Sequence, residues 1–160
     1  MKRFLKTFGL YLAIFAVAQL LSRLVLYTRV LDTSELDVPI AMSTYLFEDR
    51  GSRNPNAVAY LPRVRIDSED VIDRLFSEIR DTALRGTKGP NLFERYPVFL
   101  MILEYGEGAQ DTLMYIEVAA NRKLTVHKTK DTYCAYITQG TYDLLTEAHR
   151  EGQEKSPKES

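Results

Sequence analysis

The sequence contains few of the residues that mark common catalytic and metal sites. Its 160 residues include one cysteine, two histidines and no tryptophan. The single cysteine, Cys134, excludes an intrachain disulfide and a zinc site built from several cysteines. The formal net charge of −1 gives no general attraction to nucleic acid, so no nucleic-acid partner is expected. With 45% hydrophobic residues, the composition also excludes a wholly disordered chain.

The near-zero net charge combines two unlike parts. Residues 1–31 contain five basic residues and no acidic residue, which gives a charge of +5. Residues 32–160 contain 16 basic and 22 acidic residues, which gives −6. A basic, apolar N-terminus before an acidic remainder is typical of a globular domain with a membrane appendage.

Residues 7–28 form an apolar run in which Arg23 is the one charged residue. As a helix, these 22 residues would extend about 33 Å, enough for a hydrocarbon core of about 30 Å. Lys2, Arg3 and Lys6 precede the run, so the positive-inside rule puts the N-terminus in the cytoplasm. The sequence therefore predicts a single-pass anchor in the cell membrane, with the rest of the chain outside.

Two other interpretations of this run remain open. Ala16-Val17-Ala18 follows a basic stretch and a short apolar stretch, which is typical of a signal peptide cleaved after Ala18. Against cleavage, the sequence stays mostly apolar over residues 20–26. A buried or amphipathic helix of a cytoplasmic protein is the third interpretation, which the apolar residues on all sides of the helix disfavour.

The sequence predicts a division of the chain into four parts. They are a cytoplasmic stub and anchor (1–31), a stalk with a loop leading into the domain (32–56), an extracytoplasmic domain (57–151) and a disordered tail (152–160). Residues 40–47 are apolar enough for a strand, or for an extended segment lying on the domain.

The extracytoplasmic part has the pattern of one small α+β domain. Apolar residues at helical spacing predict a helix that Asp67 or Ser68 caps and that continues to about Ala83, with Gly86 as its stop. Apolar patterns also predict five strands and a closing helix, namely strands 57–66, 98–105, 112–119, 124–129 and 132–138 and helix 141–150. The order β-α-β-β-β-β-α predicts a mainly antiparallel sheet with helices on one face.

The most specific candidate for chemistry is His127 with Cys134. A turn at Lys130-Asp131 would put these residues opposite each other, with Cβ atoms about 5 Å apart. A Cys–His couple can activate a thiolate. However, both residues are expected on the sheet face away from the core, and no orienting carboxylate is apparent from the spacing. We therefore expect a polar pair on a sheet face rather than an enzyme.

The rest of the sequence predicts no catalytic, metal or cofactor site. His149, near the end of the last helix, is interpreted as a solvated helix end, and neither histidine has a companion at metal-ligand spacing. The loop 86–97 is a candidate contact surface, because long loops with aromatic and arginine residues often bind partners. Its candidate binding residues are Lys88, Asn91, Phe93, Arg95 and Tyr96.

The layout resembles small envelope proteins of Gram-positive bacteria, which have an N-terminal anchor or lipoprotein signal and a C-terminal α+β domain. The segments LPRVRI, SEDVIDRLFSEI, YPVFLMILEY and YITQGTYDLL carry the resemblance, which covers roughly residues 57–150. It implies a location at the cell envelope and an α+β fold, but it assigns no role to any residue. The N-terminal segment has no cysteine, which differs from the lipoproteins of this group.

These observations predict a membrane-anchored extracytoplasmic domain that binds a protein or an envelope component. An accessory or sensor subunit of a membrane complex is the first alternative. A cell-surface enzyme using the Cys–His couple is the second.

Overall fold

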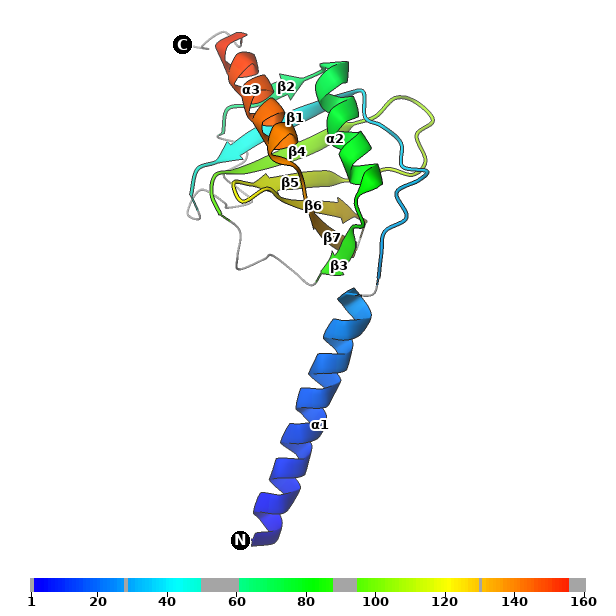
Figure 1. Cartoon of the computed structure of the whole chain (residues 1–160), viewed down its shortest axis with the longest axis vertical. Helices are drawn as coiled ribbons and strands as arrows, with labels where there is room; N and C mark the ends of the chain where they lie inside the picture. The colour runs from blue at the N-terminus through cyan, green and yellow to red at the C-terminus, as the bar shows by residue number, and fades with distance from the viewer. Residues whose placement is uncertain (1, 28, 50–60, 88–94, 130, 156–160) are drawn as a thin grey trace.

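The computed structural model describes residues 2–27, 29–49, 61–87, 95–129 and 131–155. The described elements are, in order, α1 (Lys2–Tyr27), β1 (Ala41–Phe47), β2 (Val64–Ile66), α2 (Glu69–Asp81), β3 (Arg85–Thr87), β4 (Val98–Glu104), β5 (Tyr115–Ala119), β6 (Lys123–Lys128), β7 (Asp131–Tyr136) and α3 (Gln139–Lys155). They form an α+β domain and one long helix, α1, that extends away from it (Figure 1).

The described strands form one antiparallel sheet in the order β2-β1-β4-β5-β6-β7-β3. The predicted α+β class with a mainly antiparallel sheet is thereby confirmed. β1 pairs with β4 along its whole length, from Ala41 opposite Glu104 to Phe47 opposite Val98, so it is an interior strand. The sheet therefore contains two strands, β1 and β3, that the predicted β-α-β-β-β-β-α order leaves out.

Gly86, which was predicted to end the helix, belongs instead to the strand β3. The helix α2 ends at Asp81, and Gly86 lies opposite Tyr133 of β7 at the edge of the sheet. The prediction was wrong because a glycine near the end of an apolar stripe is typical of a helix C-terminus, whereas this glycine is buried in a strand.

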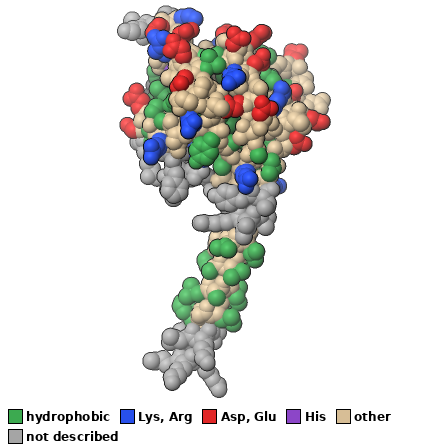
Figure 2. Space-filling view, viewed as in Figure 1, with side chains coloured by type: hydrophobic (Ala, Val, Ile, Leu, Met, Phe, Trp, Pro, Cys, Tyr) green, Lys and Arg blue, Asp and Glu red, His purple; other side chains and the backbone are tan. Residues whose placement is uncertain are grey.

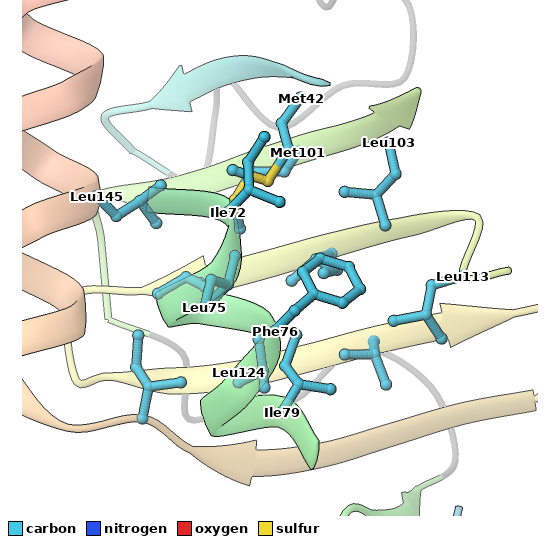
Figure 3. Packing of buried hydrophobic residues seen from close by; sticks show 14 of the residues in the cluster. Met42, Ile72, Leu75, Phe76, Ile79, Met101, Leu103, Leu113, Leu124 and Leu145 are labelled. Atoms are coloured by element: carbon cyan, nitrogen blue, oxygen red, sulfur yellow. The ribbon is translucent and has the colours of Figure 1, made fainter. Parts of the chain in front are cut away.

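The core lies between the sheet and the two helices α2 and α3, which cover the same face (Figure 1). The apolar stripe of α2 is buried as its spacing predicts, and Figure 3 shows Ile72, Phe76 and Ile79 against the strands. Each fully buried side chain of this kind contributes about 1.5–3 kcal/mol. α3 adds Leu145 and continues to Lys155, beyond the predicted end at Arg150.

The chain between α1 and β1 is bound to the domain. Leu31 N donates a hydrogen bond of 3.0 Å to Leu84 O. Arg80 Nη2 of α2 donates one of 2.6 Å to Leu36 O, and the Leu36 side chain is only 1% exposed. The polar stretch 32–37 thus includes an apolar residue that belongs to the core.

α1 carries exposed apolar side chains along its described part, residues 8–21. Figure 2 shows hydrophobic side chains over this length of the helix, and Leu10, Phe15 and Leu20 are 60%, 64% and 66% exposed. The predicted membrane span, residues 7–28, falls on α1. The structure describes side chains only for residues 8–21 of this span. Within the described part of the chain, no helix meets the length and apolar character needed to cross a membrane.

Candidate functional site

Of the predicted contact loop, the structure describes the first two residues and the C-terminal end. Lys88, Asn91 and Phe93 lie outside the described residues. The Arg95 side chain is exposed, and its backbone oxygen accepts a 2.9 Å hydrogen bond from Ala120 N. Tyr96 packs on a small apolar cluster on the sheet face away from the helices, formed by Phe47, Val98 and Ala119. This end of the loop is attached to the domain, and binding by the loop stays a prediction.

The predicted pairing of His127 with Cys134 was wrong. In the β6–β7 hairpin His127 lies opposite Thr132, and Cys134 lies opposite Thr125. The cause is Thr129, whose φ of 52° is the left-handed conformation found in tight hairpin turns. The chain therefore turns one position earlier than the prediction assumed, which moves the whole register of the hairpin.

Both residues do lie on the sheet face away from α2 and α3, as the alternation predicts. There, His127 has a carboxylate neighbour that the spacing did not reveal, because Glu117 belongs to the adjacent strand β5. Glu117 Oε2 lies 3.8 Å from His127 Nε2, and the imidazole stacks on Tyr115 with ring centroids 4.0 Å apart. Among the described residues no hydrogen bond joins His127 to the Cys134 thiol, so the geometry does not assemble the Cys–His couple.

His149 is buried, and its interpretation as a solvated helix end was wrong. Because α3 continues to Lys155, His149 lies within the helix on the side that faces the sheet, and it is 3% exposed. Its Nδ1 lies 2.7 Å from Thr44 Oγ1, and the same hydroxyl donates to Val64 O at 3.1 Å. The hydroxyl proton is then used, so His149 Nδ1 carries the hydrogen and donates. Burial lowers the pKa of His149, which favours the neutral ring.

The neutral ring leaves His149 Nε2 as a buried acceptor, and it has no hydrogen-bond partner among the described residues. The sequence does contain a signal for this burial. His149 follows Leu145 by four residues, so the two side chains share a helix face. The signal was missed because the helix was predicted to end at Arg150, which put His149 in its last turn, whereas α3 continues to Lys155.

A groove of about 320 Å³ lies between the N-terminal end of α2, the C-terminal half of α3 and the edge strand β2. Its apolar lining consists of Ile66, Val71, Leu144 and Ala148. Its charged lining consists of Arg65, Asp67, Asp70, Glu147, Glu151 and Lys155. The sequence did not predict this groove, because its residues come from two segments about 80 positions apart.

In the ranges that the structure describes, no group of three or more His, Cys, Asp or Glu side chains is placed to hold a metal ion. Comparison with known proteins finds no matching family model, no matching curated protein and no matching solved structure. The resemblance to Gram-positive envelope proteins therefore stays a prediction, and no residue role transfers from a relative.

Proposed function

We propose that the protein is a membrane-anchored interaction domain, held outside the cytoplasm by α1 and binding a protein or an envelope component. The observation that carries this proposal is the contrast between α1 and the domain. In the domain the large apolar side chains are mostly buried, whereas in the described part of α1 they are all exposed. Exposed apolar surface costs about 25 cal/mol per Å² in water, and lipid removes that cost.

The charges support the proposed orientation. Lys2, Arg3 and Lys6 precede the apolar stretch, and the acidic residues all follow residue 31. Basic residues next to a span are retained in the cytoplasm. The domain is therefore proposed to lie outside.

An accessory or sensor subunit is the second candidate, and the connection between α1 and the domain favours it. Val30 forms a bridge with Arg85 of β3, and Gly86 N donates a 2.8 Å hydrogen bond to Arg29 O. The backbone directly after α1 thus pairs with the edge strand of the sheet. A displacement of the helix would reach the domain through these bonds rather than being absorbed by a flexible stalk.

The proposed attachment is tested by fractionation of cells that express the full chain. We expect the wild type in the membrane fraction, resistant to extraction at alkaline pH. The variant Ile14→Asp/Phe15→Asp should leave the membrane, because each charge at the centre of a span costs roughly 2.5–3.5 kcal/mol. The matched control is Ile40→Asp/Met114→Asp, which changes two domain side chains that are 61% and 55% exposed and should stay in the membrane fraction.

The orientation and the signal-peptide alternative have separate tests. A reporter that works only outside the membrane, fused after Ser160, should be active. An inactive reporter would contradict the orientation. Mass spectrometry of the purified chain should show the intact N-terminus, and a chain beginning at Gln19 would show a cleaved signal peptide instead.

A further inference from the structure

The groove between α2, α3 and β2 combines an apolar floor with free negative charge. Its two basic residues are already paired, since Arg65 Nη1 lies 2.5 Å from Glu104 Oε2 and Lys155 Nζ lies 3.9 Å from Glu151 Oε2. Asp67 and Asp70, in contrast, have no hydrogen bond or ion pair from their side chains to any described residue. The unneutralised charge of the groove is therefore acidic.

We propose that this groove binds a lysine or arginine side chain of a protein partner. The aliphatic part of such a side chain packs on Leu144, which is 36% exposed, and on the small exposed part of Ile66 and Val71. Its cationic group reaches Asp67 and Asp70. Lysine and arginine both bury their stems on apolar surface while the charge stays at a polar rim. The partial charge of about +0.5 at the N-terminus of α2 is smaller than the −2 of the two carboxylates, so a cation is still favoured.

The charge of the domain indicates which kind of ligand the groove can bind. Residues 32–160 carry −6, so a second copy of this acidic domain is repelled from the groove, and so is an anionic ligand. A basic segment of a different protein is complementary. This inference rests on the proposed function of the domain as an interaction module.

The position of the groove agrees with such a partner. β2, the C-terminal end of α3 and the N-terminal end of α2 lie at the end of the domain farthest from α1 (Figure 1). Figure 2 shows both acidic and basic side chains at that end of the molecule. In a membrane-anchored chain this surface faces away from the lipid, where a partner can approach it.

The test uses the full chain in detergent micelles and two synthetic peptides. The probe is acetyl-Gly-Leu-Lys-Leu-Gly-amide, and the matched peptide has norleucine in place of lysine, which keeps the stem and removes the charge. The lysine peptide should shift the amide signals of Ile66, Val71 and Leu144 in a saturable way. The norleucine peptide should bind about fivefold more weakly, which corresponds to about 1 kcal/mol, the upper end for ion pairs between exposed groups.

Two double variants localise the charge effect. Asp67→Asn/Asp70→Asn should weaken binding of the lysine peptide about fivefold, whereas Glu69→Gln/Asp73→Asn should change its affinity less than about twofold. The control removes the same charge from two exposed α2 residues outside the groove. Equal weakening by both variants, shifts at another surface, equal binding of the two peptides, or no saturable binding at millimolar concentration would each overturn the proposal. Both variants keep α1 unchanged, so a failure here leaves the result of the membrane fractionation standing.

Discussion

His149 Nδ1 of α3 lies 2.7 Å from Thr44 Oγ1 of β1, and this contact joins residues that are 105 positions apart. The same threonine hydroxyl donates to Val64 O of β2, so one side chain connects three elements. The imidazole also meets the Phe99 ring edge-on, with centroids 5.4 Å apart. A buried histidine is therefore part of the interface that holds the C-terminal helix on the sheet.

The first prediction concerns pH. The pKa of His149 is lowered by burial in the folded chain, while the unfolded chain has the ordinary value of about 6.5. Below that pH the unfolded chain binds a proton that the folded chain resists. The stability from this group is thus complete above about pH 6.5 and is lost as the pH falls. We expect the free energy of unfolding, measured by urea titration, to decrease from about pH 8 to about pH 5.

The variant His149→Asn assigns that effect to one residue. Its amide NH₂ can still donate to Thr44, but it does not titrate. It should therefore lower the free energy of unfolding at neutral pH and show a smaller decrease between neutral and mildly acidic pH. A decrease as large as that of the wild type would show that another group causes the acid sensitivity.

The second prediction concerns the contact between α3 and β2. A Cβ atom at Gly152 would lie 2.3 Å from Cγ1 of Val64, whose branched side chain has little freedom to rotate away. Gly152→Ala should therefore destabilise the fold by about 1–3 kcal/mol.

Gly140, in the first turn of the same helix, is the matched control because a Cβ there meets no atom within 4 Å. Gly140→Ala should be neutral or stabilise by up to about 1 kcal/mol, since alanine favours the helix. Both free energies come from urea titration. Equal stabilities for the two variants would contradict the close packing of α3 on β2.

The third prediction tests whether the segment after α1 belongs to the fold. Leu36 is 1% exposed, so Leu36→Ala should lower the free energy of unfolding by about 2–5 kcal/mol. Ile40, four residues later, is 61% exposed, and Ile40→Ala should change it by less than about 0.5 kcal/mol. Thermal unfolding followed by circular dichroism measures both. If Leu36→Ala were as harmless as Ile40→Ala, this segment would be a stalk.

The fourth prediction concerns the β6–β7 turn. Thr129 is a β-branched residue at a φ of 52°, which is unfavourable, whereas asparagine tolerates this conformation. Thr129→Asn should stabilise the domain by about 0.5–1 kcal/mol. Thr87→Asn, in the extended strand β3, should instead destabilise it, because asparagine is disfavoured in strands. A lower midpoint temperature of thermal unfolding for Thr129→Asn would contradict the assigned turn. It would also contradict the position of His127 opposite Thr132, which depends on that turn.

Local patterns predicted the elements in which apolar residues repeat at a regular spacing over several positions. The spacing of Val71, Ile72, Leu75, Phe76 and Ile79 identifies α2 because a helix face repeats within four residues. The alternation of Leu124 and Val126 likewise identifies the buried face of β6. The three-residue strand β3 has too few residues to show any pattern, and it is a strand only because β7 lies beside it.

The candidate sites depended on tertiary contacts to a greater degree. The side chains around His127 come from β5 and β7, and the groove lining comes from both α2 and α3. One residue of error in the turn at Thr129 was enough to give His127 the wrong neighbour, since each shift in register changes every cross-strand pair.

The sequence by itself determined the separation of a basic apolar N-terminus from an acidic α+β domain, the helix α2 and the alternating strands, because these follow from the order and spacing of neighbouring residues. Only the tertiary structure decided that β1 lies inside the sheet, that His149 is buried against Thr44, and that Asp67 and Asp70 border a groove. These features depend on which distant segments meet. That choice is made by the burial of the whole core rather than by any stretch of sequence alone.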